Sequence, residues 1–154
     1  MKTYIVDAVR THVGRYGGPL AEARPDDLAA VTLSSIVERS AIKASDVDEV
    51  ILGAANQSGE DNRNIARMAL LLAGFPAEVP GFTVNRLCAS GLQAVASASD
   101  AIASGRADLI IAGTESSDGY TGTVPEQIAE CLGLPVSRQT FHKDHQPWPN
   151  LSMQ

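Results

Sequence analysis

The chain has 154 residues, of which 44% are apolar and 19% are charged, and its formal net charge is −6. This length suits one domain with a real core, and the acidic balance argues against a nucleic-acid surface. No apolar run approaches the roughly 20 residues that cross a membrane, and two cysteines give no disulfide framework. We therefore expect a globular, cytoplasmic protein without nucleic-acid or membrane partners.

The first half of the chain alternates strand and helix patterns. Residues 3–9 form a mostly apolar run of strand length, and a glycine-rich loop follows. A helix is predicted to begin at Pro25 with an acidic first turn. Its predicted inner face consists of Leu28, Val31, Ser35 and Ile36. A short capping signal then precedes a strand over residues 49–53.

The second half repeats this alternation. A second helix is predicted to end at Gly74 and Pro76. Its apolar face is Ile65, Met68, Ala69 and Leu72. A buried strand over residues 81–87 leads directly into a helix of small residues, and a last strand covers residues 107–112. The helical spacing of that third helix is carried by Leu92, Val95, Ser99 and Ile102. Strands alternating with helices predict an α/β fold, a parallel sheet with helices on both faces.

Cys88 stands where the strand pattern changes into the helix pattern. In the first turn of a helix, a cysteine faces backbone amides and the positive end of the helix dipole, which favour the nucleophilic thiolate. Working groups of parallel sheets also lie where strands end and helices begin. Position alone favours a small buried apolar residue instead, since cysteine is among the most buried residue types.

The residues around Cys88 decide between these readings, because they resemble the acyl-enzyme signature of the thiolases. The matching residues are Asn85, Cys88, Ala89, Ser90, Gly91, Leu92, Ala94 and Val95. Residues 7–11, 14–18, 56–68 and 107–113 also resemble the N-terminal half of this family. The strings over residues 15–18 and 56–64 are most similar to the degradative thiolases that cleave 3-oxoadipyl-CoA.

The resemblance implies a thiolase-like fold, of which this chain is the N-terminal half, and a ping-pong acyl transfer through Cys88. Its substrates would be CoA and a 3-oxoacyl-CoA, either 3-oxoadipyl-CoA or acetoacetyl-CoA, with acetyl-CoA as a product. The resemblance implies no cofactor and no metal, and it identifies no cofactor-binding residue. It also suggests that the protein is a homo-oligomer. Related thiolases add a histidine in an Asn-x-His-Gly-Gly context and a second cysteine in a Cys-x-Gly-x-Gly context, and this sequence has neither. Cys88 is therefore the one catalytic residue carried over, and the isolated chain is expected to be inactive in turnover.

After Gly113 the sequence changes character. We divide the chain into a thiolase-like part over residues 1–113, a divergent loop and helix over 114–135, and an irregular tail over 136–154. Residues 108–135 are similar to the β subunit of electron-transfer flavoproteins, whose corresponding loop approaches a nucleotide phosphate. Cys131, His142 and His145 lack the contexts that would make them catalytic. The alternative function is thus a non-catalytic nucleotide-binding or subunit-interaction module.

Overall fold

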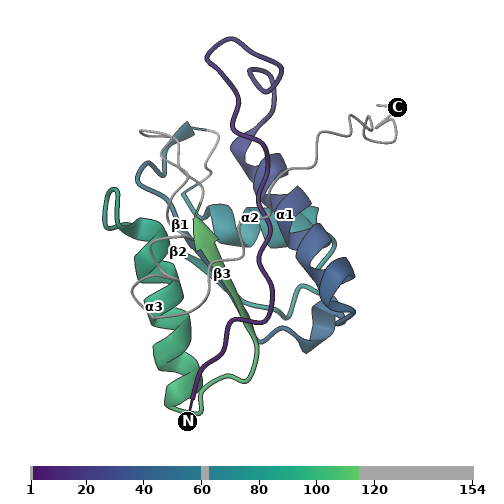
Figure 1. Ribbon diagram of the computed structural model, residues 1–154, viewed down its shortest axis with the longest axis vertical. Coiled ribbons are helices and arrows are strands. Elements are labelled where there is room, and N and C mark those ends of the chain that lie inside the picture. Colours follow the sequence, from purple (N-terminus) through teal and green to yellow (C-terminus); the bar gives the residue numbers. More distant parts are fainter. Residues whose placement is uncertain (1, 60–62, 115–154) are drawn as a thin grey trace. The chain divides into compact units, whose positions relative to one another are not determined.

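The computed structural model describes residues 2–59 and 63–114, and every structural statement below concerns these residues (Figure 1). In chain order, the elements are α1 (Pro25–Ser40), the 3₁₀ turn η1 (Ala44–Asp46), β1 (Glu49–Gly53), α2 (Ile65–Leu72), β2 (Gly81–Val84), α3 (Ser90–Ala103) and β3 (Ile110–Thr114). None of the helices in these residues is long and apolar enough to span a membrane.

The three strands form one parallel sheet in the order β2-β1-β3. Val50 pairs with Gly81 of β2 and with Ile111 of β3, so β1 is the central strand. A parallel pair requires a crossover connection, and α2 and α3 provide the two crossovers. The predicted parallel sheet is confirmed, and β1 has the predicted bounds.

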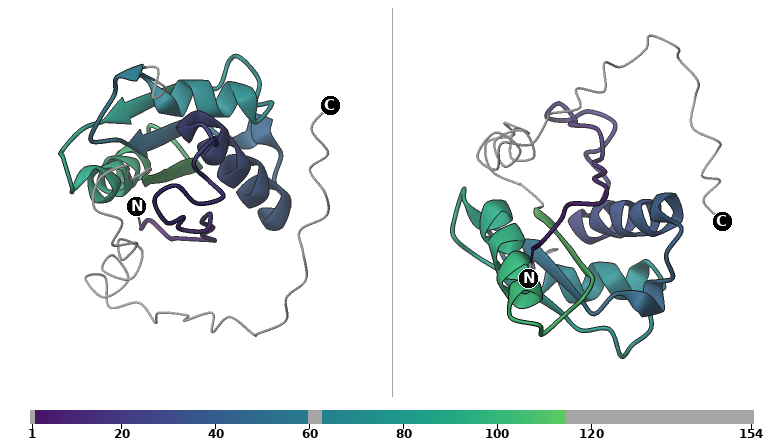
Figure 2. Two further views of the ribbon diagram at one scale, coloured as in Figure 1. Left: turned by 90° about the horizontal axis from the view of Figure 1, so that it is seen from above. Right: turned by 60° about the horizontal axis from the view of Figure 1, so that its bottom comes forward.

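The central strand separates two apolar clusters. Successive strand side chains point to opposite faces, so Val50 and Leu52 pack in the cluster that includes α1 and α2. Ile51 points the other way and packs against Ala94 and Ala98 of α3. Figure 2 shows α3 on one side of the sheet and α1 with α2 on the other. Helices therefore cover both faces, as the sequence predicted.

The buried stripe of α1 differs from the one predicted, whereas that of α2 agrees in part, since Ile65 and Ala69 are buried as predicted. In α1 the buried stripe contains Ala29 and Leu33, whereas Val31 is 45% exposed. In α2 Leu70 is buried, and Leu72 is 51% exposed. Both helices carry apolar residues on more than one side, so the periodicity did not fix their rotation. The packing of α1 on α2, and of α2 on the sheet, selects the buried stripe.

The predicted strand over residues 3–9 is not formed, since this segment has no regular secondary structure. Its large apolar side chains, among them Tyr4 and Val6, are exposed. Side-chain contacts hold it instead: the Thr3 hydroxyl donates to the Ser99 carbonyl at 3.4 Å, and Arg39 pairs with Asp7 at 3.1 Å. Strand propensity alone does not form a strand without a neighbouring strand to pair with, and none within the described ranges pairs with this segment.

Asp48 fixes the start of β1 relative to the start of β3. Its carboxylate accepts the backbone N–H groups of Asp108 at 2.7 Å and Leu109 at 3.0 Å, and its own N–H donates to the Leu109 carbonyl at 2.9 Å. The Leu109 N–H, followed by that of Asp108, holds the pKa of Asp48 below its usual value of 3.8. These bonds occupy residues 108 and 109, and β3 begins at Ile110 rather than at the predicted residue 107.

We expect Asp48→Ala to lower the free energy of unfolding by about 1 kcal/mol at pH 7, as measured by urea denaturation. A carboxyl with a depressed folded-state pKa stabilises the fold above the unfolded value, and the effect is lost as pH falls through the folded value. The difference between parent and variant should therefore be complete at neutral pH and shrink below pH 3.8.

Asp48→Asn is the matched control, because it keeps one acceptor oxygen but does not titrate in this range. It should retain more stability than Asp48→Ala at pH 7 and approach the parent in acid. A difference between the parent and Asp48→Asn that stays constant from neutral to acid pH would contradict this role for Asp48.

Candidate functional site

Cys88 lies in the loop that joins β2 to α3, and it is exposed to solvent. The loop is longer than predicted: β2 ends at Val84 instead of residue 87, and α3 begins at Ser90. Cys88 therefore precedes the N-cap residue Ala89 and is not in the first helical turn. The reason is Leu87, whose φ of +51° belongs to neither a strand nor a right-handed helix.

Hydrogen bonds hold both peptide groups of Leu87. Its N–H donates to Oδ1 of Asn85 at 2.9 Å. Its carbonyl accepts the Ser90 hydroxyl at 2.6 Å and the Ser90 N–H at 3.1 Å. The same hydroxyl accepts the N–H of Arg86 at 2.9 Å. The backbone on the N-terminal side of Cys88 is thus fixed by the side chains of Asn85 in the loop and of Ser90 at the start of α3.

A second set of bonds ties this loop to the end of β1. The Asn85 side-chain amide donates to the Ala55 carbonyl at 2.9 Å, and the Ala54 N–H donates to the Val84 carbonyl at 3.0 Å. Carboxyl ends of parallel strands meet at one edge of the sheet, and Cys88 follows the carboxyl end of β2 there. The structure confirms that Cys88 lies at a strand-to-helix junction, although it lies before the helix and not in the first helical turn.

Gly53, the last residue of β1, allows the first turn of α3 to lie directly on the sheet. A Cβ atom at this position would lie 2.3 Å from the carbonyl carbon of Ser90 and 2.5 Å from the nitrogen of Gly91. Real Cβ atoms do not approach backbone so closely, so any side chain here would displace the helix start. Sequence reasoning missed this residue, although a glycine ending an apolar strand is a sign of close backbone approach.

The site presents one thiol beside a helix start. The first residue of α3, Ser90, follows Cys88 by two positions. The neighbouring Arg86 guanidinium donates to the Gln93 side chain at 2.6 Å and so lies along α3. This arrangement suits a sulfur nucleophile that attacks an electrophile arriving from solvent. Cys131, His142 and His145 lie outside the described residues.

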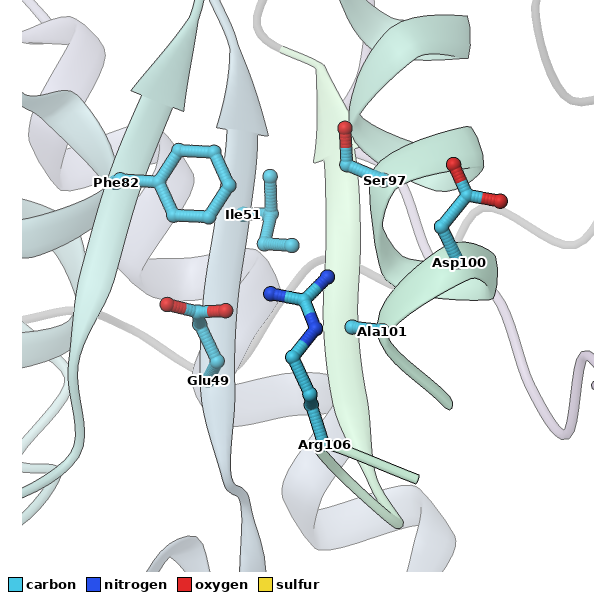
Figure 3. Close-up of a pocket in the computed structure, with 7 residues that line it drawn as sticks. All are labelled: Glu49, Ile51, Phe82, Ser97, Asp100, Ala101 and Arg106. Carbon is cyan, nitrogen blue, oxygen red and sulfur yellow. The ribbon is translucent and has the colours of Figure 1, made fainter. Parts of the chain in front are cut away.

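A separate pocket lies at the opposite end of the sheet (Figure 3). Its volume is about 220 Å³, and it opens between the start of β1 and the last turns of α3. Figure 3 shows the Arg106 guanidinium extending into it, with the carboxylates of Glu49 and Asp100 on either side. Cys88 does not line this pocket. In the described part of the chain, no three His, Cys, Asp or Glu side chains are grouped to hold a metal ion.

Comparison with known proteins relates this fold and loop to one family. Residues 3–131 match the family described as the thiolase N-terminal domain. The β-ketoadipyl-CoA thiolase of Pseudomonas knackmussii is 64% identical over 113 residues, which are 73% of this chain and 28% of that protein. A steroid 3-ketoacyl-CoA thiolase of Mycobacterium tuberculosis is 46% identical over 147 residues, 92% of this chain and 36% of that protein.

A solved structure agrees with the sequence matches. The crystal structure of the Bacillus anthracis acetyl-CoA acetyltransferase superposes with a TM-score of 0.61 and 41% identity, over 66% of this chain and 25% of that one. The chain thus spans about a quarter to a third of the length of these relatives. The family match includes most of residues 108–135 and gives no support to the flavoprotein resemblance. The divisions at residues 113 and 135 stay predictions.

We expect Gly53→Ala to lower the free energy of unfolding by about 1–3 kcal/mol, because the new methyl group overlaps the first turn of α3. Urea denaturation followed by far-ultraviolet circular dichroism measures the loss. Gly113→Ala is the matched control: Gly113 pairs with Leu52 on the neighbouring strand, and a Cβ there lies 4.0 Å from the nearest side-chain atom. Equal effects of the two substitutions would show that the close approach at Gly53 is not limiting.

Proposed function

Because the chain belongs to the thiolase family, we propose that its function is a thiolase-type acyl transfer with Cys88 as the nucleophile. The observation that carries this proposal is the position of Cys88. Its exposed thiol follows a parallel strand, precedes the N-terminus of a 14-residue helix, and stands on a loop whose backbone is hydrogen-bonded on both sides of Leu87.

The substrate class follows from the relatives. The 64% identical relative is named for β-ketoadipyl-CoA, and the more distant one for steroid 3-ketoacyl-CoA. Both names describe a CoA thioester with a 3-oxo group. We infer that this chain acts on a 3-oxoacyl-CoA, with 3-oxoadipyl-CoA as the first choice and acetoacetyl-CoA as the second. The chemistry is not a redox reaction, so it requires no redox cofactor, and it needs a compartment such as the cytoplasm that keeps the thiol reduced.

The proposed reaction has two halves. The Cys88 thiolate attacks the 3-oxo carbon, and the bond between C2 and C3 breaks. The bonding pair stays on C2 as the enolate of acetyl-CoA, which takes up a proton and leaves. The shortened acyl group remains on sulfur as a thioester. The thiolate of CoA then attacks this thioester, which gives a new acyl-CoA and regenerates the Cys88 thiolate.

The described residues provide the nucleophile but not every group that the reaction needs. The enolate requires a proton donor, and the tetrahedral intermediate requires hydrogen-bond donors aimed at its oxyanion. Because the chain spans 28% of its β-ketoadipyl-CoA relative, we propose that such groups come from a further polypeptide segment or a partner chain. By itself, the chain should form the acyl-enzyme slowly, with water as the proton source for the enolate, and should turn over poorly.

The first half-reaction can be tested by intact-mass spectrometry after incubation with acetoacetyl-CoA or 3-oxoadipyl-CoA. We expect the parent to gain one acyl group over a long incubation, because Cys88 supplies the nucleophile and water can protonate the departing enolate. Cys88→Ser should not gain it, and Cys131→Ser, the matched control, should gain it as the parent does. Equal labelling of the Cys88→Ser variant would contradict the proposal, and binding without any acyl adduct would favour the non-catalytic module.

We also propose that the chain forms homo-oligomers through the exposed side of α3. Leu92, on this side, is 48% exposed. Ala96 and Ala103 lie on the same side and are also exposed, so a partner helix can approach closely.

Sedimentation velocity at micromolar concentration should therefore show species larger than the monomer. Leu92→Glu should shift the distribution toward the monomer, since it places a charge in the contact. Leu72→Glu is the matched control, because Leu72 is similarly exposed but lies on α2. A monodisperse monomeric parent would exclude this mode of association.

A further inference from the structure

The backbone conformation of Leu87 requires an explanation. A left-handed φ of +51° is uncommon for a residue other than glycine, because Cβ crowds the backbone. The Leu87 side chain is 69% exposed, so packing of that side chain does not hold the conformation. What remains is the set of hydrogen bonds to its peptide groups. These bonds must offset the cost of the left-handed conformation.

Ser90 makes the central bonds of this set. At 2% exposure it is one of the few buried polar side chains in the described residues. A serine at a helix start usually accepts an N–H from the next turn of the helix. Here the hydroxyl points backwards instead, donating to the Leu87 carbonyl and accepting the Arg86 N–H. The N-cap position belongs to Ala89, whose side chain makes no capping bond. The Ser90 hydroxyl therefore orders the loop rather than the helix.

The position of Ser90 is itself fixed by the sheet. Its carbonyl group lies against Gly53 at the end of β1, where no side chain could fit. The helix start cannot move toward the sheet, and the serine hydroxyl connects it to the two residues that precede Cys88. The peptide group between Leu87 and Cys88 thereby takes its orientation from Ser90, and this peptide group decides which way the Cys88 side chain leaves the backbone.

We propose that Ser90 is a positioning residue, which directs the Cys88 thiol by holding Leu87 in the left-handed conformation. This inference deepens the proposed function and rests on it, because a directed thiol matters for a nucleophile. Ser90 does not itself touch the substrate. Its role is to keep the sulfur exposed at the N-terminus of α3 in one orientation, so that attack needs no rearrangement of the loop.

The test measures the rate of Cys88 alkylation by iodoacetamide across pH, in the full chain with Cys131→Ser so that one thiol remains. Ser90→Ala should slow the reaction roughly five- to a hundredfold, the factor expected for the loss of the two hydrogen bonds that its hydroxyl makes. Ser97→Ala is the matched control, since it makes the same change on the same helix at a hydroxyl bonded to Gln93. It should leave the rate unchanged.

A second substitution separates positioning from a general structural role. Asparagine adopts the left-handed conformation more readily than leucine, so Leu87→Asn should restore most of the rate lost in Ser90→Ala. The two single variants and the double variant form a cycle whose interaction energy reports this coupling. A serine that acted only through packing of α3 would not be rescued by a change at Leu87.

Either of two kinetic outcomes would overturn the proposal: a Ser90→Ala rate equal to that of Ser97→Ala, or a loss that Leu87→Asn does not restore. Chemical shifts of Leu87 in the parent provide a measurement that needs no folded variant, and an extended or right-handed Leu87 would also overturn it. Failure of the proposed function appears differently, as a parent that is alkylated at Cys88 but gains no acyl group from a 3-oxoacyl-CoA.

Discussion

The contact between Gly53 and the start of α3 is the constraint on which the rest of the site depends. It places a helix N-terminus directly against the carboxyl end of the central strand, at a distance that no side chain would allow. Ser90 is held there, and its hydroxyl reaches back to Arg86 and Leu87. Cys88 is thus positioned from the helix side by α3 and from the sheet side by the end of β2.

The sheet can impose this constraint because β1 is packed on both faces. Val50 and Leu52 contact the α1 and α2 side, and Ile51 contacts α3, so a shift of β1 would disturb both apolar clusters at once. Asp48 adds a polar link between the starts of β1 and β3. The strand that ends at Gly53 is therefore packed on both faces, and the Cys88 loop is hydrogen-bonded to the residues that follow it.

The chemistry proposed for the Cys88 loop is only one part of a thiolase reaction. The proposed reaction needs a nucleophile, a proton donor and oxyanion stabilisation, and we propose Cys88 of the described residues as the nucleophile. The chain spans about a quarter to a third of the relatives described here, which agrees with a division of these groups between segments. An acyl-enzyme that forms but is slow to be released is the expected behaviour of such a chain.

The sequence by itself determined the alternation of strands and helices, the bounds of β1, the start of α1 at Pro25, and Cys88 at a strand-to-helix junction. These follow from local signals: apolar runs, proline at a helix start, and a change of period. Tertiary structure decided which stripes of α1 and α2 are buried, that residues 3–9 lack a strand partner, and that Leu87 is left-handed. Each of these three features depends on contacts between residues distant in sequence or on several hydrogen bonds within one loop. A local pattern of residues therefore does not predict them.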